Sequence, residues 1–305
     1  MFNFLAIPLT LVSVVYVGTF TGVATIFLLE DPAFFAIPRD EIGRATNDAI
    51  FYSQAPGLIF NILAGYIYDL VGRRWTMSGG VFVAACLAVL IPYTAPSLVY
   101  FTILRAFMLM GMSVLGCHPL VNDYVTKSTR GRALALQSSG VFIGDILTFV
   151  IMLNATRHLS PYGRFQVFAF TIFLISLLFF FSVKEPKFKL KKVDERPMGV
   201  KVRELTSQVV TLCKSDILFP ICLFGTMTAR TIHSLFGTFL MLYVTKEFPV
   251  QADAEVVIQN ANIFSVIVAL IVVFPAGSLA DKIQARYLIP CAFFISSAGL
   301  VLFQL

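Results

Sequence analysis

The sequence predicts an all-α protein that crosses a membrane many times. Hydrophobic residues make up 58% of the 305-residue chain and charged residues only 13%, whereas a soluble domain carries about 25% charged residues. The apolar residues gather in runs of roughly 20, which span the ~30 Å core of a bilayer as helices. Most lysines and arginines stand between these runs. The net charge of +6 is therefore better explained by membrane topology than by a nucleic-acid partner.

Nine apolar segments can be drawn along the chain, with polar residues between them. They cover approximately residues 4–29, 47–68, 76–94, 97–124, 133–156, 164–183, 217–243, 256–280 and 287–305. The first segment is too long for a signal peptide and lacks a basic leader, so we expect no cleavable signal. The five cysteines lie in or beside apolar segments without close spacing, which predicts neither a metal site nor a disulfide framework.

A charged tip joins the second and third segments. It reads Gly65-Tyr66-Ile67-Tyr68-Asp69-Leu70-Val71-Gly72-Arg73-Arg74. Two membrane-length helices joined this tightly need a glycine in the turn. Arginines are costly to place in hydrocarbon, so the tip must lie in water.

The same pattern returns 212 residues later, between the eighth and ninth segments. Gly277, Asp281 and Arg286 repeat the first glycine, the carboxylate and the basic end, and Gln284 replaces the middle glycine. Repeated hairpins at a long offset are typical of transporters built from internal repeats.

The two hairpins resemble the signature of the major facilitator superfamily, Gly-x-x-x-Asp-(Arg/Lys)-x-Gly-Arg-Arg. The first copy departs from it at Leu70, where the family usually has a basic residue. The fourth segment is also similar to the family pattern, with five residues between Arg105 and Gly111 and with Asp123 followed by Arg130-Gly131-Arg132. The closest branches are the sugar porters and organic-ion carriers. Lys184-Glu185-Pro186 weakly resembles their motif after the sixth helix.

The resemblance implies a conformational latch at the inner helix ends, formed around Asp69, Arg73 and Asp123. Opposite charges a few ångströms apart stabilise each other where water is partly excluded. The alternative is that these charges only cap helices and fix topology. The residues assigned to this latch are Gly65, Asp69, Gly72, Arg73, Arg74, Asp123, Asp281 and Arg286.

Loop charges predict the orientation. Loops after even-numbered segments hold 16 lysines and arginines, and loops after odd-numbered segments hold 5. Positive residues favour the cytoplasmic side, so the N-terminus and both hairpin tips are expected there. Asn154-Ala155-Thr156 is a glycosylation sequon too close to the bilayer to be used.

The predicted domains are a six-helix N-terminal bundle (1–183), a cytoplasmic central loop (184–216) and a partial C-terminal bundle of three helices (217–305). The central loop is either a solvated, topology-setting segment or an amphipathic one attracted to anionic lipids. The family has twelve helices. We expect a chain shortened after the ninth helix, a partner subunit that supplies the rest, or a degenerate relative of the family.

Charges inside the apolar segments predict the binding site, because such charges are costly and usually functional. Arg105, Asp145 and Arg230 lie at similar depths on three segments, and Thr226 and His233 share the face of Arg230. Two arginines and one carboxylate favour an anionic solute. Asp145 or His233 could take up a coupling proton. The alternative to a binding site is that Arg105 and Asp145 form a structural ion pair and that His233 is a hydrogen-bonded core residue.

The sequence predicts a secondary active or facilitative carrier of a small polar organic solute, with no cofactor. No phosphate-binding loop, catalytic triad or metal-ligand cluster occurs in it, so an enzyme or an ATP-driven pump has little support. The alternative is a transporter-derived accessory subunit that no longer transports. The membrane charges argue against that alternative, because a scaffold has no use for them.

Overall fold

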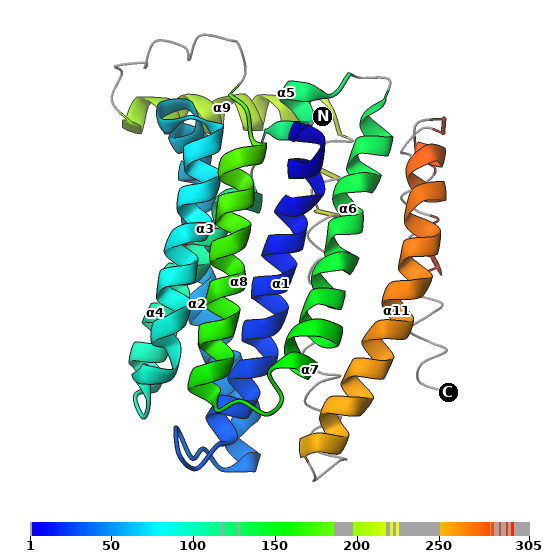
Figure 1. The fold of residues 1–305 in the computed structure, drawn as a ribbon. Helices are drawn as coiled ribbons and strands as arrows, with labels where there is room; N and C mark the ends of the chain where they lie inside the picture. The colour runs from blue at the N-terminus through cyan, green and yellow to red at the C-terminus, as the bar shows by residue number, and fades with distance from the viewer. Residues whose placement is uncertain are drawn as a thin grey trace. The chain divides into compact units, whose positions relative to one another are not determined.

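A computed structural model describes the whole chain except for a set of residues whose structure is not described here. These are residues 1, 117–118, 127–128, 186–197, 218–219, 222–223, 226–250, 281, 284–286, 288–290, 292–293 and 296–305. Helices account for nearly all of the described part, and no strand occurs in it (Figure 1). This confirms the predicted all-α fold.

Five helical stretches in the described residues are long and apolar enough to cross a bilayer. They are Phe4–Glu30, Arg73–Thr94, Leu98–Tyr124, Arg130–Ala155 and Pro161–Ser182. Each coincides with a predicted segment to within a few residues. The predicted segments 217–243 and 287–305 lie largely outside the described residues.

Helix α2 (Arg39–Val71) is longer than predicted. It starts directly after Pro38, and Asp40 and Glu41 occupy its first turn, where carboxylates interact favourably with the helix dipole. Hydropathy detects only the part inside the bilayer, so the first two turns were missed.

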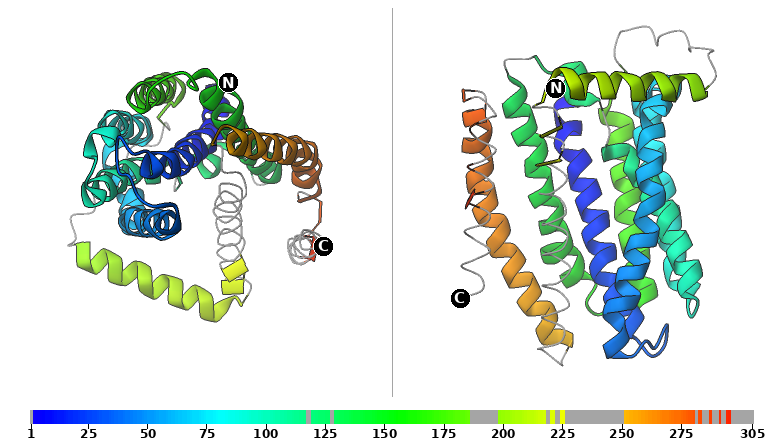
Figure 2. Two further views of the ribbon diagram at one scale, coloured as in Figure 1. Left: turned by 90° about the horizontal axis from the view of Figure 1, so that it is seen from below. Right: turned by 180° about the vertical axis from the view of Figure 1, so that it is seen from behind.

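Helix α1 (Phe2–Glu30) is the centre of the bundle and contacts four other long helices. These are α2, α4 (Leu98–Gly116), α6 (Arg130–Ile146) and α8 (Pro161–Ser182). Helix α3 (Arg73–Leu90) packs against α4 and α8, and α2 packs along α4. The view along the helix axes in Figure 2 shows this arrangement. Stacked rings of Phe20 and Phe168, with centroids 4.0 Å apart, fill the contact between α1 and α8.

Helices α1 and α6 approach closely through two glycines one turn apart. A Cβ built on Gly144 would stand 2.8 Å from the backbone oxygen of Val12, and one on Gly140 would collide with the oxygen of Pro8. Small residues let helix backbones meet in this way inside a membrane. This contact fixes α6, and with it Asp145, against the central helix.

The fifth span changes its winding just after Asp145. A π-helical turn (η3, Leu147–Met152) follows α6 and leads into α7 (Leu153–Ala155). The hydroxyl of Thr148 in this turn donates to the backbone oxygens of Gly144 and Tyr16. Single π turns often occur at functional positions.

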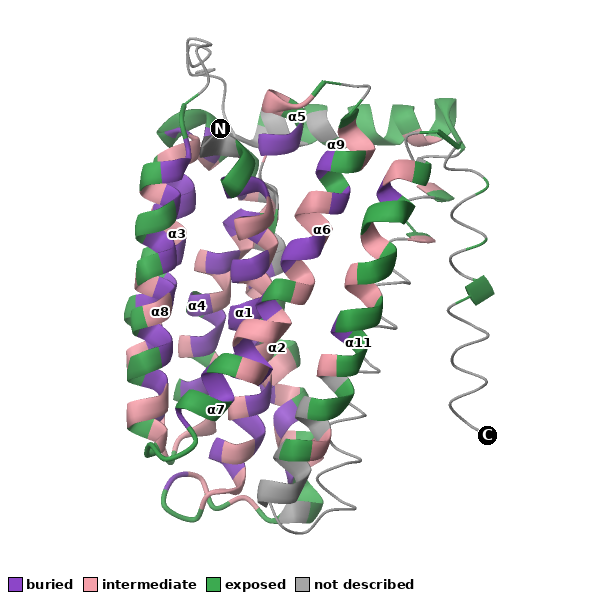
Figure 3. Ribbon diagram, turned by 45° about the vertical axis from the view of Figure 1, so that its right-hand side comes forward, coloured by how far each residue is buried: buried purple, intermediate pink, exposed green. Residues whose placement is uncertain are grey.

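The chain divides into two compact units. One comprises Met1–Leu190 and Val256–Gln284, and the other comprises Lys191–Glu255 and Ala285–Leu305. The first contains the bundle, the short α5 (Leu120–Tyr124), the 3₁₀ turn η1 (Ile91–Thr94) and nearly all of α11 (Gln251–Ala280). More than half of the α11 residues whose burial the structure describes are exposed (Figure 3). The second unit contains α9 (Met198–Ser215), a helix within the predicted central loop.

Candidate functional site

The turn between α2 and α3 consists of one residue, Gly72. Its φ of 95° and ψ of 167° end α2 and begin α3 at the same position. Residues with a Cβ rarely adopt such a φ. The helices therefore follow each other directly, and Arg73 and Arg74 become the first turn of α3.

Arg73 joins three elements at this end of the bundle. Its Nε donates to Asp123 Oδ2 of α5 at 3.2 Å, and its Nη1 lies 3.4 Å from Asp69 Oδ1 on α2. Nη1 also donates to the backbone oxygen of Tyr68. The side chains of Arg73 and Asp123 are 14% and 23% exposed, whereas that of Asp69 is 75% exposed. The Arg73–Asp123 pair is thus the better shielded of the two.

Glu185, just beyond α8, is a partner of the turn that the sequence did not reveal. Its two carboxylate oxygens accept from the backbone N–H groups of Arg73 (3.1 Å) and Arg74 (2.8 Å). A carboxylate at a helix N-terminus satisfies unpaired N–H groups and interacts with the helix dipole. The guanidinium of Arg74 stacks 3.9 Å over the ring of Phe180. The end of the sixth span is therefore bound to the turn.

Arg105 is a buried cation inside the fourth span. It is 3% exposed and lies about 10 Å along α4 from Leu98. Its Nη1 donates to the hydroxyl of Thr25 on α1 at 3.3 Å. Within the described residues, its buried Nε has no hydrogen-bond partner. A buried donor without a partner is rare and calls for an explanation.

Asp145 is half-buried on α6 and faces the same central helix. Its Oδ1 accepts from the hydroxyl of Thr19 on α1 at 3.1 Å. Thr19 and Thr25 are six residues apart, or about 9 Å along the helix. Arg105 and Asp145 therefore bond to different turns of α1, and their threonine partners were not among the predicted site residues.

The remaining predicted site residues either lie away from the turn or are not described by the structure. Gly65 lies inside α2, and a Cβ on it would meet open space within the described part of the chain. Thr226, Arg230, His233, Asp281 and Arg286 lie outside the described residues.

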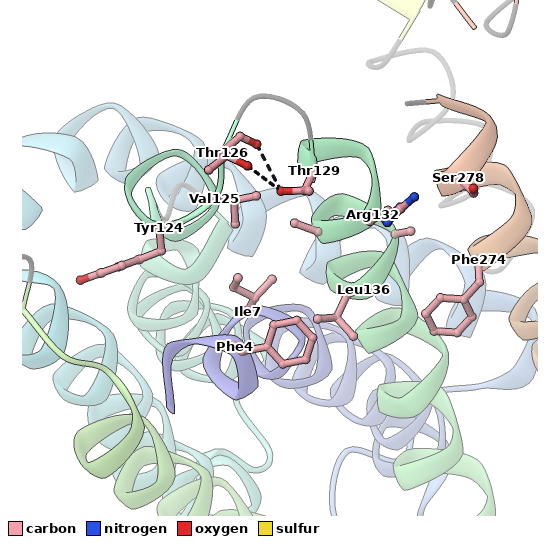
Figure 4. A pocket seen from close by; sticks show the side chains of 12 residues that line it. Phe4, Ile7, Tyr124, Val125, Thr126, Thr129, Arg132, Leu136, Phe274 and Ser278 are labelled. Carbon is pink, nitrogen blue, oxygen red and sulfur yellow. Dashed lines mark hydrogen bonds between the residues drawn. The ribbon is translucent and has the colours of Figure 1, made fainter. Parts of the chain in front are cut away.

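A pocket of about 590 Å³ opens at the same end of the bundle as the turn. Phe4, Ile7, Leu136 and Phe274 form its apolar wall, and Arg132 and Ser278 stand at its rim (Figure 4). Thr126 and Thr129, whose hydroxyls lie 2.9 Å apart, close one side. Beside it, α11 crosses α6 where Gly277 contacts Ala135.

The sequence model of the Major Facilitator Superfamily matches residues 6–305. No curated protein and no solved structure matches the chain. The match covers almost every residue and includes both hairpins and all the helices described above. The chain therefore belongs to the major facilitator superfamily, a family of multi-pass membrane transporters.

Proposed function

We propose that this protein is a secondary carrier that moves a small polar organic solute, an anion by preference, by alternating access. The unpartnered Nε of Arg105 is the observation that supports this proposal most directly. A guanidinium held inside a membrane span is costly, and this one leaves a donor unused. A carboxylate or phosphate group would accept from it and neutralise its charge.

Asp145 is the second charged residue of the proposed site and bonds to a different turn of α1 from Arg105. Its carboxylate accepts from Thr19 and could take up a coupling proton. Arg230, His233 and Thr226 remain part of the proposal as contributions of the C-terminal half.

The cluster of Asp69, Arg73 and Asp123 is the proposed latch of one end state. Arg73 contacts both carboxylates at the turn, so separation of α3 from α5 would break the shielded pair. In this proposal the turn and the N-terminus face the cytoplasm, in keeping with the charge bias of the loops. The proposed domain boundaries remain 1–183, 184–216 and 217–305.

The proposal is tested by uptake into vesicles that contain the purified full chain. A panel of radiolabelled organic anions, cations and neutral solutes is offered with and without a pH gradient. We expect saturable uptake of an anion, a loss of at least about tenfold in Arg105→Gln, and partial retention in Arg105→Lys. Arg44→Gln is the matched control, because Arg44 is exposed at the start of α2.

Full uptake by Arg105→Gln would remove Arg105 from the site. Absence of uptake for every solute, with a folded protein, would favour the accessory-subunit alternative. Stimulation by an inward proton gradient that is lost in Asp145→Asn would identify the proton as the coupling ion.

A further inference from the structure

Helix α9 has two faces of opposite character. Apolar residues recur at i, i+3, i+7 and i+10, and polar residues recur at i, i+4, i+8 and i+11 on the other side. The apolar positions are Val202, Leu205, Val209 and Leu212. The polar positions are Arg203, Ser207, Thr211 and Lys214, and Val200 and Val210 are the apolar residues on this side. This two-sided pattern is the strongest among the described helices, and it does not occur in the all-round apolar spans.

Two of the four positions of the apolar stripe, Val209 and Leu212, have exposed side chains in the part of the chain that the structure describes. Val209 and Leu212 are each 44% exposed. Cys213, which adjoins the stripe, is half-exposed. Contiguous exposed apolar side chains on a helix indicate a partner or a membrane surface.

Chain connectivity favours the membrane over a separate partner. The preceding span α8 ends at Ser182, and the next apolar segment begins at Ile217, two residues after α9 ends at Ser215. Two residues reach only about 7 Å, so the C-terminal end of α9 is held at the bilayer surface. A tethered helix needs little intrinsic affinity, because its effective concentration at the surface is in the millimolar range.

The charge of α9 agrees with this environment. Lys201, Arg203 and Lys214 outnumber Glu204, and bilayer surfaces that contain anionic lipids attract basic helices. Amphipathic helices with low overall hydrophobicity lie in the interface and do not span the bilayer. The spacing of the two faces requires the helix axis to be parallel to the membrane plane.

We propose that α9 is an in-plane helix bound to the lipid–water interface. Val209, Leu212 and Cys213 face the acyl chains, and Arg203, Ser207, Thr211 and Lys214 face water. The proposal depends on the chain being a membrane protein and is independent of any transported solute.

Cys213 provides the test, because it borders the apolar stripe. In the full chain, Cys86, Cys117, Cys222 and Cys291 are replaced by Ala, a bimane fluorophore is attached to Cys213, and the protein is reconstituted with brominated phospholipids. The matched control carries Cys213→Ser and Ser207→Cys, with the fluorophore on the polar face. We expect bromine quenching about threefold stronger at Cys213 than at position 207. Equal quenching at both positions, or none at either, would overturn the proposal.

A second pair of variants separates lipid contact from a folding defect. Val209→Glu places a charge on the stripe and should reduce quenching at Cys213 to the level of the polar face. Ser207→Glu should leave quenching at Cys213 unchanged. The thermal unfolding midpoint should be the same in both variants, because α9 lies outside the bundle unit. Unchanged quenching in Val209→Glu would rule out the stripe as the lipid contact.

Discussion

The carboxylate of Glu185 lies directly over Gly72, so that a Cβ on Gly72 would stand 2.7 Å from Glu185 Oε1. The two residues are far apart in the sequence, and they join the end of the sixth span to the turn between the second and third. Two independent reasons therefore require glycine at this position. Its φ is positive, and the Glu185 carboxylate occupies the space that a Cβ would fill.

Replacing Gly72 with Ala should destabilise the protein by about 1–3 kcal/mol, because it adds backbone strain and displaces Glu185. The thermal unfolding midpoint in detergent measures the effect. Gly65→Ala is the matched control in the same motif. Gly65 is helical with open space around it, so alanine there should be neutral or slightly stabilising. Similar losses in both variants would refute this account of the turn.

Replacing Glu185 with Ala should cost about 1 kcal/mol, because the N–H groups of Arg73 and Arg74 lose their carboxylate. Glu185→Gln keeps an acceptor oxygen and should retain part of this stabilisation. Chemical denaturation of the purified protein can rank the three forms. If Glu185→Ala were as stable as the parent, these exposed hydrogen bonds would contribute nothing measurable.

A double-mutant cycle on Arg73 and Asp123 should give a coupling energy of about 1 kcal/mol. The corresponding cycle on Arg73 and Asp69 should give about 0.5 kcal/mol or less, because Asp69 is 75% exposed and water screens that pair. Unfolding free energies of the single and double alanine variants measure both. A larger coupling for Asp69 than for Asp123 would contradict the observed shielding.

Replacing Gly140 with Leu should destabilise the bundle by about 3 kcal/mol, because the side chain would force α6 away from the backbone of α1. Gly18→Leu is the control on α1, since a Cβ on Gly18 meets nothing within 4 Å. Expression level and the unfolding midpoint report the difference. A stable Gly140→Leu protein would show that the two helices can separate without loss.

Hydropathy predicted most of the fold because the bilayer imposes a common length on every span. It could not predict the first turns of α2, which lie beyond the apolar window, or the π turn after Asp145. The cluster at Arg73 was predicted from resemblance and charge. Glu185 was not assigned to it, because its hydrogen bond to Arg73 joins residues 112 apart and nothing local in the sequence indicates that contact.

The polar residues of α1 show why the intramembrane site was only partly predictable. Thr10 and Ser13 are buried polar residues of α1, and their hydroxyls donate to the backbone oxygens of Ile7 and Leu9 in the same helix. Hydroxyl groups in a membrane helix can donate to backbone oxygens three or four residues earlier in the same helix. Only the packing of α4 and α6 reveals that Thr19 and Thr25 contact the charged side chains.

Helix α2, at 33 residues, is about 50 Å long, some 20 Å more than the hydrocarbon core needs. Its first turns present Asp40, Arg44 and Asn47 on one exposed face. An antibody fragment raised against that face would be held rigidly by a continuous helix. It would stand clear of a detergent micelle and give a small membrane protein the visible marker that image alignment in electron microscopy requires.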